Sequence, residues 1–117
     1  MHEMSLMTSV LETADETARK SGAKSITRIS LTVGVMSDVL SDALEFAFEV
    51  LSPESPYADG AELVITQVTP RSRCQVCGLE FDHDRFHRSC PSCQALATEL
   101  LAGRELFIES IEVENGD

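Results

Sequence analysis

The chain of 117 residues contains four cysteines, arranged as two Cys-x-x-Cys pairs. Cys74 pairs with Cys77 and Cys90 pairs with Cys93, and 12 residues separate the two pairs. Each pair presents two sulfurs at the separation of two corners of a tetrahedron, so the four thiolates can close one metal site. A zinc ion held by four thiolates has no open position for a substrate. The spacing therefore predicts a structural Zn²⁺ site, and we expect no catalysis at this metal.

Two other interpretations of these cysteines remain open, which are two disulfides or an iron–sulfur cluster. Residues 1–20 carry several charged side chains and no long apolar run, so we expect no signal peptide. We therefore expect a cytoplasmic chain whose thiols stay reduced, which favours zinc. No stretch approaches the roughly 20 apolar residues of a membrane span, so we expect no membrane partner either.

The net charge of −11 argues against a nucleic-acid partner. Binding to nucleic acid depends largely on neutralising phosphates with a basic surface. Residues 70–104 hold five arginines and four acidic residues, and the rest of the chain carries the excess of acid. We interpret the arginines as offsetting the negative charge of a zinc–thiolate centre, and we expect no nucleic-acid binding.

Hydrophobic periodicity predicts the elements that position the cysteines. We expect helices over residues 4–20 and 38–51, and strands over residues 26–35, 61–69 and 105–114. The second helix has a wide apolar stripe that Phe46 and Val50 broaden, and Ser37 or Ser41 could cap it. In the second strand, a run of apolar residues indicates burial on both faces (Leu63, Val64, Ile65 and Val68).

The last predicted strand needs a partner, and the simplest solution adds it to the sheet of the two earlier strands. The fold class is then α+β, with two helices on a small three-stranded sheet and an inserted zinc-ribbon module. The predicted domains are residues 1–69 plus 105–117, which form the α+β domain, and residues 70–104, which form the zinc ribbon.

The first three residues, Met1-His2-Glu3, suggest a second metal site. The imidazole of a histidine at position two, its own backbone nitrogen and neighbouring main-chain nitrogens can reach one metal ion. A planar set of nitrogens suits Ni(II) or Cu(II) better than zinc. Glu3 could add an oxygen ligand or orient the imidazole. The alternative is a solvated terminal histidine without a metal.

Several motifs together resemble the HypA/HybF family of hydrogenase maturation proteins. The chain opens with Met1-His2-Glu3, and a strand ending in Val33-Gly34 precedes a helix that contains Ala47-Phe48-Glu49. Glu62-Leu63, the two cysteine pairs and a final acidic strand through Ile111-Glu112 follow. The resemblance covers essentially the whole chain. The cysteine pairs alone are common to many ribbons, whereas their combination with the opening Met-His-Glu at this length is specific.

This resemblance implies a nickel metallochaperone with a nickel-binding α+β domain and a structural zinc domain. By position, the nickel residues would be His2 and Glu3, and the zinc ligands would be the four cysteines. The implied partners are a HypB-type GTPase and the large subunit of NiFe hydrogenase, and some members also serve urease. Some relatives supply a further nickel carboxylate before the second helix. Leu40 stands there in this chain, with Asp38 and Asp42 nearby, and neither aspartate can be assigned that role.

Two histidines in the cysteine gap, His83 and His87, are interpreted as surface residues, with an auxiliary metal-binding role as the alternative. A zinc-ribbon interaction module without nickel cargo is the main alternative function. An enzyme is a third possibility that we do not expect, because no nucleophile–base set or phosphate-binding loop is present and every cysteine is committed to the metal.

Overall fold

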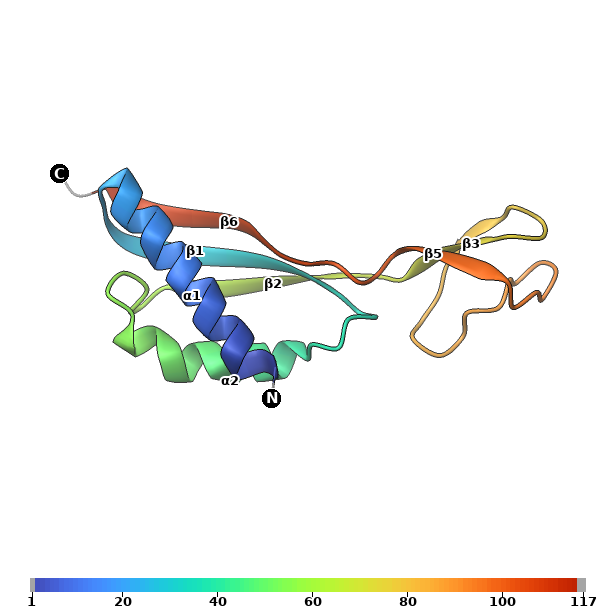
Figure 1. The fold of residues 1–117 in the computed structure, drawn as a ribbon, viewed down its shortest axis with the longest axis horizontal. Helices are drawn as coiled ribbons and strands as arrows, with labels where there is room; N and C mark the ends of the chain where they lie inside the picture. Colours follow the sequence, from blue (N-terminus) through green and yellow to red (C-terminus); the bar gives the residue numbers. More distant parts are fainter. Residues whose placement is uncertain (1, 116–117) are drawn as a thin grey trace. The chain divides into compact units, whose positions relative to one another are not determined.

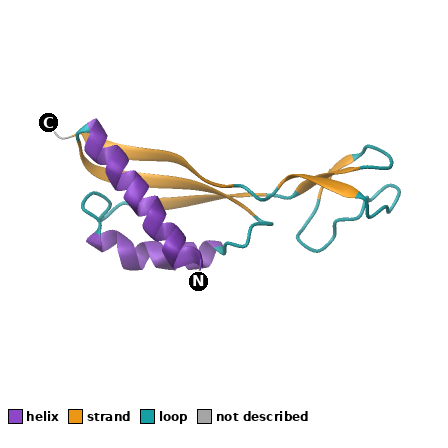
Figure 2. Cartoon of the chain, viewed as in Figure 1, coloured by secondary structure: helices purple, strands orange, loops and turns teal. Residues whose placement is uncertain are grey.

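The computed structural model describes residues 2–115, without the side chain of His2. The chain divides into two compact units. The first contains Met1–Leu31, Val39–Thr66 and Phe107–Asp117, and the second contains Thr32–Asp38 and Gln67–Leu106. Both helices belong to the first unit, and a small sheet with long loops makes up most of the second (Figure 2).

The helical layer consists of α1 (His2–Ser21), α2 (Ser41–Leu51) and a short 3-10 turn, η1 (Ser52–Glu54). The apolar stripe of α1 is buried, and so is the inner face of α2 with Leu44, Ala47 and Phe48. Complete burial of Met7 or Leu44 contributes about 1.5–3 kcal/mol for each side chain. The two helices pack on one another, which places the start of α2 near the first turn of α1.

The sheet of the first unit has the strand order β2-β1-β6 and confirms the expected three strands. Its members are β1 (Ala23–Gly34), β2 (Glu62–Val68) and β6 (Leu106–Asn115), with β1 in the centre (Figure 1). The buried side chains of β1 include Ile29, Leu31 and Val33 on one face of the strand, and Thr32 between Leu31 and Val33 is buried as well. The chain therefore returns after the cysteine segment to complete the sheet with β6.

The opposite face of this sheet is polar and centred on Arg28 of β1. Its guanidinium contacts Glu62 of β2 at 3.0 Å and Glu112 of β6 at 3.2 Å, so one side chain spans all three strands. The carboxylates raise the pKa of Arg28, chiefly through the hydrogen bond that Arg28 donates to Glu62. These groups are exposed to solvent, so the ion pairs specify strand alignment more than they stabilise the fold.

The structure corrects the sequence prediction in three details of the first unit. Helix α2 begins at Ser41 instead of residue 38, and its N-cap residue is Leu40, so neither Ser37 nor Ser41 occupies the N-cap position. The apolar side chains of β2 are half-buried instead of fully buried on both faces, since β2 is an edge strand. Phe46 and Val50 do not broaden the buried stripe of α2, because both are exposed.

The second sheet, in the second unit, has the strand order β4-β3-β5. It consists of β3 (Arg71–Cys74), β4 (Glu80–Asp82) and β5 (Thr98–Ala102), and β3 is antiparallel to both neighbours. Arg71 pairs with Asp82 at 2.9 Å and Arg73 with Glu80 at 3.1 Å. These two arginines therefore pair with carboxylates across the strands, whereas the sequence suggested that they offset thiolate charge.

Two backbone segments of the second unit, residues 34–36 and 103–105, approach one another closely. The N–H of Gly34 donates to the carbonyl of Glu105 at 2.7 Å, and the N–H of Met36 donates to the carbonyl of Gly103 at 2.7 Å. A Cβ on Gly34 would lie 2.1 Å from the carbonyl oxygen of Gly103. Only glycine fits at position 34, because the neighbouring atoms belong to backbone that cannot move aside.

Among the described residues, no helix combines the length and the apolar character needed to cross a bilayer.

Candidate metal centre

The four cysteine sulfurs meet in the second unit. Each cysteine offers one sulfur, and the four sulfurs lie within 4.8 Å of one another. Two contacts join the two pairs, with the sulfur of Cys74 3.5 Å from that of Cys93 and the sulfur of Cys77 3.6 Å from that of Cys90. A tetrahedron with zinc–sulfur bonds of about 2.3 Å has sulfur–sulfur edges of about 3.8 Å. The donor set therefore fits one tetrahedral metal ion of the size of zinc.

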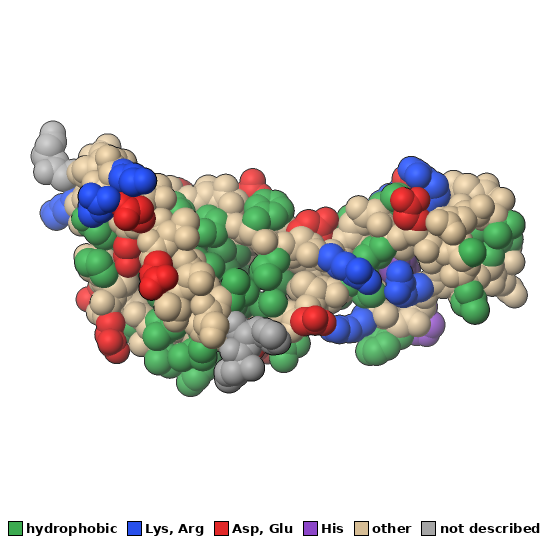
Figure 3. Space-filling view, in the orientation of Figure 1, with side chains coloured by type: hydrophobic (Ala, Val, Ile, Leu, Met, Phe, Trp, Pro, Cys, Tyr) green, Lys and Arg blue, Asp and Glu red, His purple; other side chains and the backbone are tan. Residues whose placement is uncertain are grey.

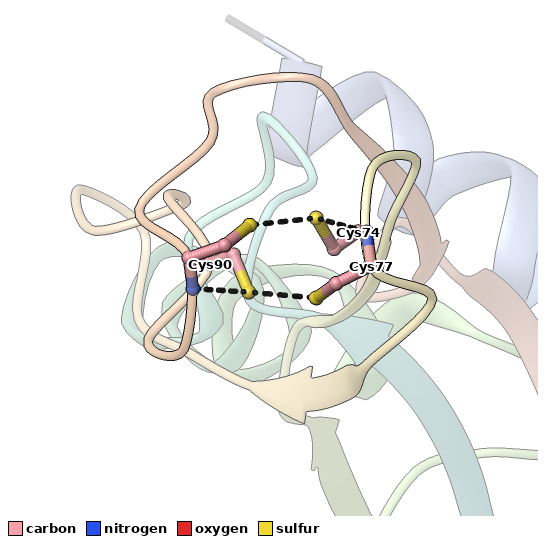
Figure 4. A group of neighbouring side chains, drawn as sticks. Cys74, Cys77 and Cys90 are labelled. Carbon is pink, nitrogen blue, oxygen red and sulfur yellow. Dashed lines mark hydrogen bonds between the residues drawn. The ribbon is translucent and has the colours of Figure 1, made fainter.

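Figure 4 shows the labelled cysteines turned toward one another from two separate loops. All four are free thiols, so the structure offers no support for disulfides. Cys74 and Cys90 are buried, whereas Cys77 and Cys93 are exposed. When bound, a metal ion would join the two loops through their buried and exposed sulfurs alike.

The two Cys-x-x-Cys turns have the same local structure. The Gly78 N–H bonds to the Cys74 carbonyl at 2.9 Å, and the Gln94 N–H bonds to the Cys90 carbonyl at 2.8 Å. Both residues have a positive φ, +80° for Gly78 and +64° for Gln94. The left-handed conformation costs a non-glycine residue about 1–2 kcal/mol, so Gln94 is held there by the surrounding structure.

Backbone N–H groups point at the first sulfur of each pair. The N–H groups of Val76 and Cys77 each lie 3.4 Å from Cys74 Sγ. Those of Ser92 and Cys93 lie 3.4 Å and 3.5 Å from Cys90 Sγ. Such donors stabilise the thiolate over the thiol, and the thiolate is the form that binds a metal cation.

These contacts divide the thiols into two classes. The hydrogen bond from the Cys77 N–H, with help from Val76, lowers the pKa of Cys74 to about 6. Chiefly because of the Cys93 N–H, the pKa of Cys90 is also lowered. The Ala95 N–H acts to lower the pKa of Cys93, but hydrogen bonding with the other three thiols and burial together outweigh it and raise that pKa to about 12. Each loop therefore offers one thiol with a lowered pKa, Cys74 or Cys90, and one with a raised pKa, Cys77 or Cys93.

Little apolar packing supports this centre. The buried cluster around it consists of Cys74, Phe81 and Cys90, with Ala95 packed against them. Such a small core cannot offset the loss of chain entropy on folding without a further constraint. A metal ion bound by the four thiols would supply that constraint, in agreement with a structural role.

The two histidines of the intervening loop differ from each other. His87 is exposed, as predicted, and its ring nitrogen Nδ1 contacts the carboxylate of Asp84 at 2.7 Å, which lowers the pKa of Asp84. His83 is half-buried instead, because its Nε2 lies 2.7 Å from the hydroxyl of the fully buried Ser72. Among the described residues, the only cluster suited to a metal is the four cysteines, so neither histidine joins a metal site there.

The residues expected to bind nickel belong to the first compact unit, unlike the cysteines. His2 begins α1, but its side chain lies outside the described residues, and so does Met1. Glu3 lies in the first turn of α1, and its Oε2 accepts a hydrogen bond from the Leu40 N–H at 3.1 Å. The residue at the expected third position, Leu40, is itself 61% exposed. The link between Glu3 and Leu40 joins positions far apart in sequence, and no local pattern predicts it.

Comparison with known proteins identifies one family over nearly the whole chain. Residues 1–113 match the family described as hydrogenase/urease nickel incorporation, metallochaperone, HypA. The chain is 40% identical over 114 residues to the hydrogenase maturation factor HypA of Chlorobaculum parvum, covering 97% of this chain and 100% of that protein. It is 36% identical over 115 residues to the protein of the same name from Dehalococcoides mccartyi, covering 98% and 96%.

Two solved structures have a similar fold. A solution structure of a HypA protein superposes with a TM-score of 0.70 and 26% identity, covering 97% of this chain and 96% of that one. The solution structure of the nickel metallochaperone HypA from Helicobacter pylori gives a TM-score of 0.67 at 24% identity, covering 97% and 98%. At that identity the second comparison supports the fold alone.

Proposed function

The chain belongs to the HypA family of nickel metallochaperones and is a hydrogenase maturation factor, and on this premise we propose that it carries Ni(II) to a NiFe hydrogenase. The observation that carries the proposal is the family match, which includes the opening Met-His-Glu and extends through both cysteine pairs. Family membership does not favour a zinc-ribbon module without cargo.

We propose that His2 and Glu3 bind the nickel cargo. The first four N–H groups of a helix have no partner within the helix, so the main-chain nitrogens at the start of α1 remain available as ligands. A cation at this end meets the positive end of the helix dipole, which opposes binding. The negative charge of Glu3 counters that field, and deprotonated backbone amides would counter it further. Such a site selects nickel by its nitrogen donors and remains open enough to release it.

We propose that Cys74, Cys77, Cys90 and Cys93 hold a resident zinc ion. The sulfur separations, the N–H groups aimed at Cys74 and Cys90 and the small core around them support this role. The zinc ribbon would correspond to residues 70–104, inserted between strands of the nickel-binding domain of residues 1–69 and 105–117.

The remaining proposals concern where and with what the protein acts. We propose a HypB-type GTPase and the hydrogenase large subunit as its partners, with urease maturation proteins as further candidates. We place this activity in the cytoplasm, where thiols stay reduced. The role is that of a carrier, not a catalyst, because four thiolates leave the zinc no open position.

Nickel titration of three untagged forms tests the cargo site. The native chain, a form extended at its N-terminus and His2→Ala should each retain one zinc ion and the same circular dichroism spectrum. We expect the native chain alone to bind nickel tightly, because extension and substitution each remove nitrogen ligands. Equal nickel affinity in all three forms would exclude the terminal site. Nickel content of hydrogenase matured with each form then tests delivery.

A further inference from the structure

Helix α2 exposes apolar side chains on the face that points away from its own core. Phe46 is 62% exposed and Val50 is 43% exposed, while Leu44 and Ala47 on the inner face are fully buried. Residues four apart on a helix are neighbours, so Phe46 and Val50 form one continuous patch. A helix that is apolar on both faces is usually covered on both faces.

Carboxylates accompany this patch. Asp42, Glu45 and Glu49 are all exposed, and α2 contains no Lys or Arg. None of the three forms an ion pair within the described residues, in contrast to Arg28 and Glu62 on the sheet. With about 100° of rotation for each residue, all three carboxylates fall on the same side of the line from Phe46 to Val50. Glu45 and Glu49 are four residues apart and repel one another.

We propose that the outer face of α2, defined as Asp42, Glu45, Phe46, Glu49 and Val50, is a docking surface for an amphipathic helix of a partner protein. The partner's apolar side chains would cover Phe46 and Val50. Its Lys or Arg residues, along one flank of the helix, would pair with the three carboxylates. An exposed aromatic anchor beside complementary charges is a common centre of binding energy.

The negative charge of this face favours a basic partner helix over a second copy of the chain, nucleic acid or an anionic lipid surface. A second copy docked α2 against α2 would place like carboxylates together, which opposes association. Nucleic acid and anionic lipid surfaces require basic residues, which α2 lacks. Figure 3 shows exposed hydrophobic side chains over α2 with acidic side chains nearby. A helix with both basic and apolar side chains would cover the apolar patch and pair with the carboxylates of this face.

The docking surface begins next to the proposed cargo site. Helix α2 starts directly after Leu40, whose N–H is bound by Glu3. At a rise of about 1.5 Å per residue, Phe46 lies about 9 Å along the helix axis from Leu40. A partner helix on this face would therefore reach the end of α2 where nickel is proposed to bind. Its use in nickel transfer rests on the proposed function, whereas the docking itself does not.

A synthetic peptide of about 15 residues, with a leucine stripe flanked by lysines, is the probe for this surface. Its affinity for the zinc-loaded full chain is measured by fluorescence anisotropy, beside a counterpart flanked by glutamates. We expect the lysine peptide alone to bind, with an affinity that falls as salt is added. The double variant Phe46→Ser/Val50→Ser should weaken binding about tenfold or more.

A matched pair of charge variants separates docking from general attraction to an acidic protein. Glu45→Gln/Glu49→Gln on α2 and Glu12→Gln/Glu16→Gln on the exposed face of α1 remove the same charge at the same spacing. Only the α2 pair should weaken binding. Equal weakening by both pairs, or no binding to the native chain, would overturn the proposal.

Two controls complete the test. Zinc content and circular dichroism should match the native chain for every variant, and if the serine variant fails to fold, the charge pairs decide alone. Sedimentation that shows a native dimer lost on Phe46→Ser/Val50→Ser would assign the face to a second copy and overturn the proposal. Nickel affinity is measured separately, so failure of the cargo site leaves the docking result intact.

Discussion

The backbone N–H of Leu40 donates a hydrogen bond to Oε2 of Glu3, with 3.1 Å between nitrogen and oxygen. Leu40 is the N-cap residue of α2, and no side chain of α2 caps that end. In a capping box, a glutamate of the same helix reaches back to the N-cap N–H. Here the glutamate comes from the first turn of α1 instead. The start of α1 and the start of α2 are therefore linked through one carboxylate.

Glu3→Gln and Glu3→Ala should separate the structural role of this carboxylate from its proposed nickel role. The glutamine keeps an oxygen acceptor for the Leu40 N–H, whereas alanine removes it at a cost of about 1 kcal/mol. We expect faster amide hydrogen exchange at Leu40 in the alanine variant only. Nickel affinity should fall in both variants, because both lose the charge. Identical exchange in the two variants would contradict the capping role.

Cys90→Ser should remove zinc and unfold the second unit while leaving the first intact. The core around Cys90 is too small to hold that unit without metal, and structural zinc supplies about 10–16 kcal/mol in small domains. Metal analysis should show about one zinc ion per native chain and close to none in the variant. Amide NMR signals should collapse for residues of β3, β4 and β5 only. Ser89→Ala, at an exposed neighbouring position, is the control and should retain both zinc and signals.

Zinc binding should release fewer than four protons at neutral pH. The pKa of Cys74 is lowered to about 6 and that of Cys93 is raised to about 12, so at pH 7 the first is already a thiolate and the second still carries its proton. We expect release of fewer than four protons, measured by calorimetry in buffers of different ionisation enthalpy.

The pH dependence of zinc affinity should follow the same thiols. As the pH falls through about 6, Cys74 regains its proton, so the number of protons released rises and zinc affinity falls more steeply. Release of four protons at pH 7 would mean that the N–H contacts to the sulfur of Cys74 do not form in the metal-free chain.

Ser72→Ala should destabilise the second unit more than His87→Ala. The Nδ1 of His83 lies 2.7 Å from the carbonyl of Asp84, which can only accept, so Nδ1 carries a proton. In neutral His83, Nε2 then accepts a hydrogen bond from the buried Ser72 hydroxyl. Loss of this hydrogen bond costs about 1 kcal/mol of stability. His87 is exposed, so its removal should change stability by less than about 0.5 kcal/mol.

Thermal unfolding of the zinc-loaded protein measures this difference, and ¹⁵N spectra of the histidine rings report the tautomer. A proton on Nε2 of neutral His83, or equal losses of stability in the Ser72 and His87 variants, would contradict the assignment.

Gly34→Ala should be among the most damaging small substitutions in the chain. Its Cβ would meet the carbonyl oxygen of Gly103 at 2.1 Å and the backbone nitrogen of Arg104 at 2.6 Å. We expect a loss of about 3 kcal/mol or more in urea unfolding, because backbone must shift. Gly60→Ala is the control, since Gly60 has open space around it and only its φ of +86° opposes alanine. That control should cost about 1–2 kcal/mol, and equal losses would show that space is not the limiting factor.

The sequence predicts those parts of the structure that depend on local patterns. Alternation in β1, the helical period of α1 and the cysteine spacing each follow from a repeat a few residues long. The need of β6 for a partner predicts its place in the sheet. Phe46 and Val50 show the limit of such patterns, because an apolar side chain in the sequence does not reveal whether a neighbouring element covers that face of the helix.

Long-range contacts mark the second limit. The bond from the Leu40 N–H to Glu3 and the bond between Ser72 and His83 join residues separated by 37 and 11 positions. Neither follows from propensity or periodicity, since each depends on how two elements meet. His83 therefore could not be distinguished from His87 before the strand β3 was placed beside it.

The arrangement of the sulfurs also has a redox consequence. Two sulfur–sulfur contacts join different turns, Cys74 with Cys93 at 3.5 Å and Cys77 with Cys90 at 3.6 Å. A two-electron oxidant acting on the metal-free chain could join such a cross-turn pair as a disulfide, because the two sulfurs already lie near one another. Disulfides of that kind would lock the ribbon in a form that excludes zinc. A resident metal ion therefore shields the thiols from oxidation as well as holding the loops.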